Sequence, residues 1–380
     1  MNLPKKLTIK LKSREENNSL RSLKPSNNLV DFSSNDYLGF AKAEVIFDKA
    51  HQFLVDENIK INGATGSRLL SGNHSLYEVV EKQISEFHQT ETALIFNSGY
   101  DANVGFFSSV PQRGDVILYD EFIHASIRDG MQLSNAKSYK FKHNDLVDLK
   151  YHLERSREIS SKEHEIYVVT ESVFSMDGDS PDLKKLSEIC KKNNAFLIVD
   201  EAHAVGVFNG GLIQKLNLQN DVFARIITFG KALGCHGAAI LGGKELQQYL
   251  INFARSFIYT TGLSPHSLAT IKCVYDEVVS SSGVENSNKL QENIHHFKSE
   301  AKQLQLDFIE SNSAIHCCVI SGNEKVKSIA QKIQEKGFDV KPILSPTVSI
   351  NEERLRFCLH AYNSKKEICT VLELLNNFIK

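Results

Sequence analysis

Short apolar runs recur along the middle of the chain and constrain its fold more than any other feature. They span residues 116–119, 166–170, 196–199, 226–229 and 238–241. Strands that are apolar along their whole length are buried on both faces, which is typical of a parallel sheet covered by helices. Segments with helical spacing, such as residues 183–192, lie between the runs. This alternation predicts an α/β fold with a mostly parallel mixed sheet between helices.

The two ends of the chain predict smaller parts of the molecule. Residues 1–28 are polar with weak periodicity, and VDFSSNDYLG at 30–39 predicts a short extended segment. A long amphipathic helix is predicted over 289–309, and after it the pattern predicts strands and helices at 314–320, 324–337, 354–359 and 366–379. A chain of 380 residues is too long for one hydrophobic core. We therefore expect an N-terminal arm over 1–45, a large α/β domain over 46–285 and a small C-terminal α+β domain over 286–380.

Composition excludes several classes of partner. The formal net charge of −2 supplies no field that would attract nucleic acid or an anionic membrane surface. The seven cysteines are irregularly spaced and odd in number, which argues against a disulfide framework. No stretch reaches the roughly 18 apolar residues of a membrane span, and the basic N-terminus lacks the apolar core of a signal peptide. We expect a cytoplasmic protein that binds a small molecule.

Polar residues at the ends of two predicted strands indicate a cofactor site. Asp200 and His203 follow the run at 196–199, and Lys231 follows the run at 226–229. Ligands of open α/β sheets bind at the carboxyl ends of the strands. There a carboxylate can hold a protonated pyridine nitrogen, a histidine can reach a phenolic oxygen, and a lysine among apolar walls is suited to imine formation. Two alternatives are a surface lysine and a Mg²⁺-binding nucleotidase, but the latter needs a GxxxxGK[ST] loop that the chain lacks.

Other polar strings have both a functional and an ordinary interpretation. NSGYDAN at 97–103 opens a predicted helix and suits a phosphate, because free N–H groups at a helix start bind anions; a simple turn with a helix cap explains it equally well. His124 can lie flat on a cofactor ring or act as a structural hydrogen-bonding group. The run at 171–179 is either a turn or a wall from which Ser175 donates to the cofactor's phenolic oxygen.

The collinear strings as a set resemble those of the α-oxoamine synthases, fold-type I enzymes that depend on pyridoxal 5′-phosphate. The matching strings are SSNDYLG at 33–39, GSRLLSGNHSLYEVVEKQI at 66–84, NSGYDAN at 97–103, HASI at 124–127, TESVFSMDGD at 170–179, VDEAH at 199–203, TFGKALG at 228–234 and RLRFCL at 354–359. They cover nearly the whole chain after about residue 28 in the family's order. The resemblance implies a large pyridoxal phosphate-binding domain, a small C-terminal domain and a homodimer with a shared active site.

The resemblance also assigns roles to residues of the expected site. Lys231 forms a Schiff base with the cofactor and later moves the substrate's α-proton, while Asp200 pairs with the pyridine nitrogen. His124 stacks on the ring, and His203 and Ser175 contact the phenolic oxygen. The implied phosphate contacts are Ser98, Gly99, Tyr100 and Thr228, with Thr260 or Thr261 donated by a second subunit. The implied substrate contacts are Asn35 and Arg356 for the amino acid's carboxylate and Arg21 near the acyl substrate. No metal is expected.

The expected reaction joins L-alanine to a pimeloyl thioester carried by CoA or a carrier protein, with loss of CO₂, in biotin biosynthesis. One alternative is a sister synthase that uses glycine or serine with another acyl-CoA. Another is a binding or regulatory protein that retains the fold without turnover. Two departures bear on this choice: Ala204-Val205-Gly206 follows His203 where the family often has Gly-Thr-Gly, and Leu344 stands where relatives often carry an arginine. Lys341, three residues upstream of Leu344, is the candidate replacement for that arginine.

Overall fold

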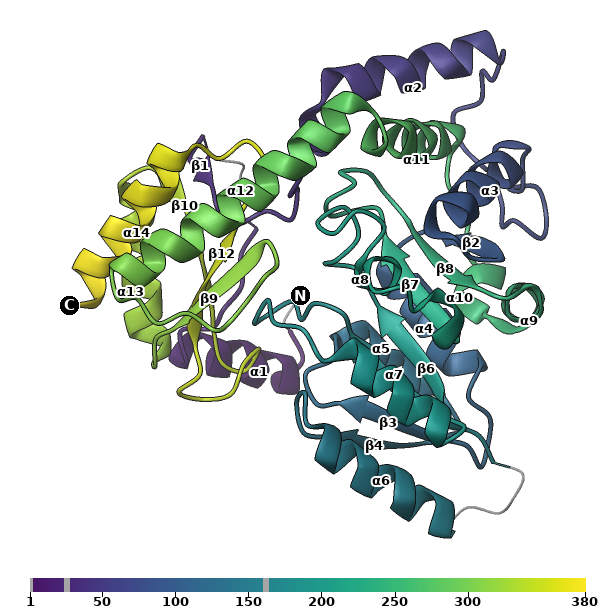
Figure 1. The fold of residues 1–380 in the computed structure, drawn as a ribbon, viewed down its shortest axis with the longest axis horizontal. Coiled ribbons are helices and arrows are strands. Elements are labelled where there is room, and N and C mark those ends of the chain that lie inside the picture. Colours follow the sequence, from purple (N-terminus) through teal and green to yellow (C-terminus); the bar gives the residue numbers. More distant parts are fainter. Residues whose placement is uncertain (1–2, 24–27, 160–163) are drawn as a thin grey trace. The chain divides into compact units, whose positions relative to one another are not determined.

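The computed structural model describes residues 3–23, 28–159 and 164–380 (Figure 1). Their contacts divide the chain into two compact units. Unit 1 combines the N-terminal residues up to Asn35 with Met176–Asp179 and Lys289–Lys380, and unit 2 combines Asp36–Ser175 with Ser180–Asn288. The domain boundaries expected at residues 45 and 285 stay predictions.

Unit 2 is built on a seven-stranded sheet among its described residues, in the order β2-β8-β7-β6-β5-β3-β4. The strands are β2 Thr92–Phe96, β3 Val116–Asp120, β4 Lys137–Phe141, β5 Ile166–Glu171, β6 Phe196–Asp200, β7 Ala224–Thr228 and β8 Ala238–Gly242. Neighbours from β4 to β7 are parallel, whereas β8 runs antiparallel to both β2 and β7. The predicted mostly parallel mixed sheet is therefore confirmed.

Two hydrophobic cores cover the faces of this sheet. Val168 and Val169 are neighbours in β5 and both fully buried, yet they belong to different cores because successive strand side chains point to opposite faces. One core includes Phe106 and Leu250, and the other includes Leu186. Burial on both faces is the physical reason that these strands read as continuous apolar runs.

The helices of unit 2 lie around this sheet (Figure 1). They are α2 Glu44–Asp56, α3 Leu76–His88, α4 Gly99–Ser109, α5 Ala125–Leu133, α6 Leu146–Ile159, α7 Leu183–Lys192, α8 Leu212–Lys215, α9 Lys244–Phe253, α10 Arg255–Ile258 and α11 Pro265–Val278. Helix α2 packs against α11, and α4 packs against α5. Among the described residues, no helix has the length and apolar character needed to cross a membrane.

Unit 1 is the smaller α+β lobe that the sequence predicts. Strands β11 Lys341–Ile343, β12 Arg354–Cys358 and β9 Ile315–Val319 form an antiparallel sheet in that order, and β1 Val30–Asp31 pairs with β10 Phe338–Asp339 in parallel. The helices are α1 Lys5–Glu16, α13 Asn323–Glu335, α14 Lys365–Ile379 and the part of α12 Ser281–Gln303 that lies beyond Asn288. Phe297, Phe357 and Leu372 are fully buried in this unit.

Some predicted elements differ from the structure. The polar N-terminal segment contains helix α1, none of whose side chains is buried, so its sequence has no apolar stripe to reveal it. The edge strand β4 was also missed, because four of its five side chains are exposed. The predicted boundaries of the long helix at 289–309 were wrong, since α12 begins at Ser281 and ends at Gln303.

Candidate active site

The carboxyl ends of β5, β6 and β7 bring the candidate residues of unit 2 to one edge of the sheet. Asp200, the last residue of β6, is paired with Glu171 of β5 on one side and with Ile226 of β7 on the other. His203 lies in the turn after β6, and Lys231 lies in the connection that follows β7. The strand register thus places the carboxylate of Asp200 between the ends of β5 and β7 at this edge of the sheet.

Lys231 and His203 are in direct contact. The Nζ atom of Lys231 lies 2.7 Å from Nε2 of His203, and Nδ1 of the same ring lies 2.8 Å from the hydroxyl of Tyr37. Tyr37 is fully buried. A histidine engaged at both nitrogens has a fixed ring plane, so the lysine amine has a defined polar neighbour.

Asp200 is a buried carboxylate with neutral partners. Its Oδ2 accepts a hydrogen bond of 2.9 Å from the side chain of Asn103, and its Oδ1 accepts one of 2.9 Å from the backbone N–H of Ala202. Only 6% of Asp200 is exposed, and both of these hydrogen bonds come from uncharged groups. A buried carboxylate without a cation is costly, and a protonated pyridine nitrogen would supply one. This environment fits the pyridine ring of pyridoxal phosphate.

His124 lies close to the charges of both Asp200 and Lys231. It caps helix α5, where its Nδ1 accepts from the backbone N–H of Ser126 at 3.3 Å and lies 2.7 Å from the Ser126 hydroxyl. Burial lowers the pKa of the imidazole; the charge of Asp200 raises it and that of Lys231 lowers it. A neutral imidazole whose residue is exposed at this edge of the sheet is suited to lie on an aromatic cofactor ring.

Glu171 is a candidate site residue that sequence reasoning missed. It is buried at the end of β5, and its Oε1 accepts the backbone N–H of His124 at 2.6 Å. Burial, followed by the charge of Asp200, holds its pKa well above the ordinary value. The signal was present, since an acid directly after a buried strand is the same pattern that identified Asp200.

The start of helix α4 has the features of a phosphate site. Ser98 is its N-cap, and the Ser98 hydroxyl accepts from the backbone N–H of Asp101 at 3.0 Å. Gly99 and Tyr100 lie in the first turn, where N–H groups have no partner within the helix. A Cβ atom added to Gly99 would lie 3.7 Å from the side chain of Thr228, so Thr228 faces the same turn. The Tyr100 hydroxyl instead donates to Asp129 at 2.7 Å.

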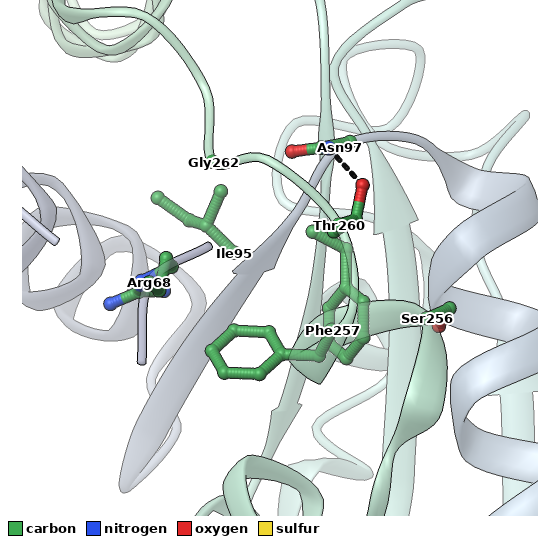
Figure 2. Close-up of a pocket in the computed structure, with 8 residues that line it drawn as sticks. Arg68, Ile95, Asn97, Ser256, Phe257, Thr260 and Gly262 are labelled. Atoms are coloured by element: carbon green, nitrogen blue, oxygen red, sulfur yellow. Dashed lines mark hydrogen bonds between the residues drawn. The ribbon is translucent and has the colours of Figure 1, made fainter. Parts of the chain in front are cut away.

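Thr260 and Thr261 lie next to this turn within one chain. The side chain of Asn97 donates to the Thr260 hydroxyl at 3.0 Å, the bond drawn as a dashed line in Figure 2. The same side chain donates to the Thr261 carbonyl at 2.7 Å. Asn97 directly precedes Ser98 in the sequence. The supply of either threonine by a second subunit stays a prediction.

The remaining candidates differ in their surroundings. Within unit 1, the guanidinium of Arg356 donates to Oδ1 of Asn35 at 3.0 Å, which brings together the two residues expected to hold a carboxylate. Arg356 lies in β12 and is 9% exposed. Arg21 is exposed in unit 1, and Ser175 is half-buried after β5 in unit 2.

Comparison with known proteins finds relatives that match nearly the full length of the chain. The model of the family described as "Aminotransferase class I and II" matches residues 27–375. An 8-amino-7-oxononanoate synthase of Emericella nidulans is 38% identical, with 97% of this chain and 94% of the relative covered. A serine palmitoyltransferase variant from S. paucimobilis, solved with a bound pyridoxal phosphate–myriocin adduct, has a TM-score of 0.87 at 25% identity and covers 98% of this chain and 96% of that chain. The 8-amino-7-oxononanoate synthase of Francisella tularensis has a TM-score of 0.78 at 27% identity. Its match covers 93% of this chain and 98% of that chain.

Proposed function

The chain belongs to the aminotransferase class I and II family as a pyridoxal phosphate-dependent α-oxoamine synthase, and from this membership we propose that it condenses L-alanine with a pimeloyl thioester. The product would be 8-amino-7-oxononanoate, in biotin biosynthesis. The observation that carries the choice is the 38% identity over nearly the full length to a synthase of that name. The contact of Lys231 with His203 beside a buried Asp200 supports the catalytic part of the proposal.

The residues at the sheet edge have complementary tasks in this reaction. Bound pyridoxal phosphate supplies an electron sink that stabilises negative charge on the amino acid's α-carbon. Asp200 keeps the ring nitrogen protonated, and His124 packs on the ring. His203 and Ser175 hold the phenolic oxygen. The amine of Lys231 holds the cofactor covalently before the substrate binds and then moves the α-proton, a task that typically contributes about 10²–10⁴-fold to the rate.

The start of α4 is the proposed phosphate site. The backbone N–H groups of Gly99 and Tyr100 point out of the first helical turn, and the positive end of the helix dipole favours a dianion there. Hydroxyl groups of Ser98 and Thr228 complete the site. Either Thr260 or Thr261 adds a further hydroxyl, from a second copy in the proposed homodimer.

We assign substrate recognition to residues of unit 1. Arg356, oriented by Asn35, binds the amino acid's carboxylate as a two-pronged donor, and Arg21 lies near the acyl substrate. The acyl chain of a pimeloyl donor ends in a carboxylate of its own, in addition to the carboxylate of the amino acid. Relatives often carry an arginine where this chain has Leu344, and Lys341 is the cation closest in sequence to that position. The Nζ atom of Lys341 lies 2.6 Å from Oδ1 of Asp339.

A substrate panel tests the proposal. The purified holoenzyme is incubated with alanine, glycine or serine and with pimeloyl, acetyl, succinyl or palmitoyl thioesters, and CO₂ release and product mass are measured. Alanine with a pimeloyl thioester is the expected productive pair. Turnover with serine and palmitoyl-CoA would favour the reaction of the structural relative from S. paucimobilis, whose TM-score is 0.87. Binding of pyridoxal phosphate with no turnover on any pair would indicate a regulatory protein.

A further inference from the structure

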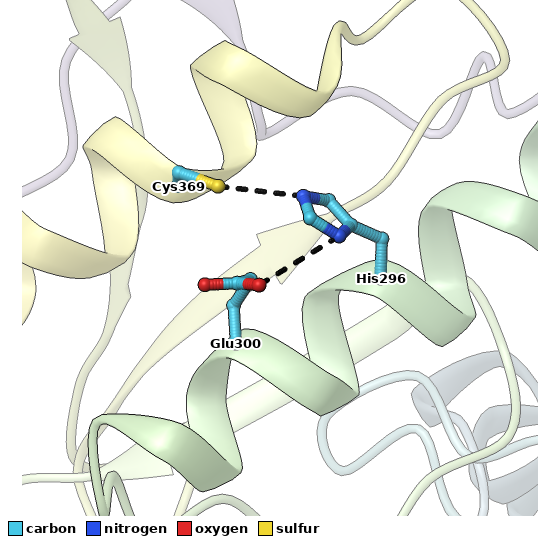
Figure 3. A group of neighbouring side chains, drawn as sticks. All are labelled: His296, Glu300 and Cys369. Atoms are coloured by element: carbon cyan, nitrogen blue, oxygen red, sulfur yellow. Dashed lines mark hydrogen bonds and ion pairs between the residues drawn. The ribbon is translucent and has the colours of Figure 1, made fainter.

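Two helices of unit 1 bring three different metal-binding side chains together. His296 and Glu300 are one turn apart on α12, and Cys369 comes from α14 (Figure 3). The Cys369 sulfur lies 3.3 Å from Nε2 of His296, and Oε1 of Glu300 lies 3.9 Å from Nδ1 of the same ring. One ligand atom from each of the three residues lies within 4.8 Å of the other two.

We propose that His296, Glu300 and Cys369 form a binding site for a divalent transition-metal ion, with Zn²⁺ as the best match to their donor atoms. Thiolate, imidazole and carboxylate groups are the ligands from which proteins build zinc sites, whereas Mg²⁺ and Ca²⁺ prefer oxygen alone. The site shares no residue with the candidate active site. It therefore stands or falls independently of the proposed synthase reaction.

The spacing of the donor atoms is close to that of a zinc site. With Zn–S and Zn–N bonds of about 2.3 and 2.05 Å at a tetrahedral angle, sulfur and nitrogen lie about 3.6 Å apart. The sulfur of Cys369 and Nε2 of His296 lie 3.3 Å apart, so an ion fits between them with a small adjustment. One carboxylate oxygen of Glu300 lies within 4.8 Å of the ligand atoms of His296 and Cys369, which makes it the third ligand of the proposed site. Water completes four-coordination, as it does in zinc sites with three protein ligands.

The surroundings favour a cation and leave it a path of entry. The side chains of His296 and Glu300 are 21% and 25% exposed, so one side of the cluster remains open to solvent. The negative charges of Glu300 and Glu373 act on the Cys369 side chain. The same negative field attracts a divalent ion, and ion binding then displaces the thiol proton. The ion would join the C-terminal helix α14 to α12.

Cobalt titration of the holoenzyme tests the site, because Co²⁺ replaces Zn²⁺ and its thiolate complexes absorb in the near ultraviolet. One equivalent of Co²⁺ should add this thiolate-to-cobalt band, and Zn²⁺ should displace it. Cys369→Ser should abolish the band, and His296→Ala and Glu300→Gln should each weaken Co²⁺ binding by roughly tenfold or more. Difference spectra against the metal-free holoenzyme remove the contribution of the cofactor.

Two neighbouring residues provide matched controls. His295 is exposed on the same helix and its Nδ1 contacts the carbonyl of Gln291 at 2.8 Å, so His295→Ala should leave Co²⁺ affinity unchanged. Glu292→Gln changes an exposed carboxylate of the same helix and should also have no effect. Zn²⁺ should raise the Tm of the parent protein and of both controls, but not of His296→Ala.

Two outcomes would overturn the site. One is the absence of a thiolate band at any Co²⁺ concentration up to the millimolar range. The other is a band that persists with unchanged affinity in both Cys369→Ser and His296→Ala, which would place the ion elsewhere. His296 and Glu300 are partly exposed on a helix surface, so their variants can report even if Cys369→Ser fails to fold.

Discussion

The amine of Lys231 and the imidazole of His203 lie 2.7 Å apart, and the ring is held from its other side by the hydroxyl of the buried Tyr37. This contact joins two residues that come from different strand connections, one after β6 and one after β7. It holds in place the amine that we propose binds the aldehyde of the cofactor. The roles of the surrounding residues can be tested one by one.

Lys231→Ala should abolish covalent attachment of pyridoxal phosphate and reduce synthase activity by at least about 10²-fold. The reason is that no other amine lies at this edge of the sheet among the candidate residues. Borohydride reduction followed by peptide mass spectrometry measures the attachment. Lys244→Ala, at an exposed position at the start of α9, serves as the control and should retain both properties. Cofactor mass on another peptide of the parent protein would contradict the assignment.

Asp200→Asn keeps the shape of the side chain and removes its charge. Because a neutral amide cannot stabilise a protonated pyridine, we expect kcat to fall by about 10²–10⁴-fold, in the range of general acid–base effects. Steady-state kinetics at saturating cofactor measure the loss. Ser126→Ala, which removes a hydroxyl bonded to Asn103 but leaves the carboxylate, should have a smaller effect. Equal losses in both variants would mean that packing, not charge, is responsible.

Arg356→Lys should raise the KM for the amino acid about 10- to 100-fold with a smaller change in kcat. A lysine retains the charge but loses the planar fork that grips a carboxylate with two hydrogen bonds. The contact with Asn35 at 3.0 Å would be weakened as well. Initial rates over a range of alanine concentrations separate the two constants. An unchanged KM would remove Arg356 from the substrate site.

A buried ion pair supports the sheet behind the active site. Arg225 and Glu201 are 1% and 0% exposed, and their closest nitrogen and oxygen atoms lie 2.6 Å apart. Arg225→Met should lower the free energy of unfolding by about 3–5 kcal/mol, because it leaves Glu201 buried without its partner. Urea unfolding measures this change. Glu91→Gln breaks the exposed pair with Lys244 and should cost at most about 1 kcal/mol.

His316 should make the protein less stable in mild acid. It is stacked on Phe297, and burial lowers the pKa of His316 from 6.5 to about 3. Its stabilising contribution is therefore complete above pH 6.5. It declines as the pH falls toward 3, because the unfolded chain binds a proton that the folded chain does not.

His316→Phe should remove this dependence. Between about pH 7.5 and about pH 5.5, the parent protein should lose about 1.4 kcal/mol more stability than the variant. Urea unfolding at the two pH values measures the difference. His295→Ala, at an exposed position, should behave like the parent. Identical pH dependence in His316→Phe and the parent would show that His316 can be protonated in the folded state.

Elements with a buried face could be predicted from the sequence, whereas elements with mostly exposed side chains could not. The strands from β5 to β8 were predicted because nearly all of their side chains are buried. Strand β4 and helix α1 have mostly exposed side chains, so no hydrophobic period marks them.

The same distinction explains what was found at the candidate sites. Asp200 and Lys231 could be singled out because each follows a buried strand whose end position is readable from the pattern. Glu171 obeys the same rule and was missed, although its string was noted. Cys369 could not be connected with His296, since their proximity depends on the packing of α14 beside α12, which no local pattern encodes.

The reversal of direction at β8 constrains the backbone on both sides of Lys231, the amine proposed to bind the cofactor. Lys231 belongs to a connection between two antiparallel neighbours, and Thr228 and Ala238 are paired directly across its ends. Inside it, Phe229 donates to the Gly237 carbonyl at 2.9 Å and Gly234 donates to the Lys231 carbonyl at 2.8 Å. The backbone that carries Lys231 is thus tethered on both sides before any ligand arrives. The backbone part of the entropy needed to aim the amine is therefore lost during folding and not when the cofactor binds.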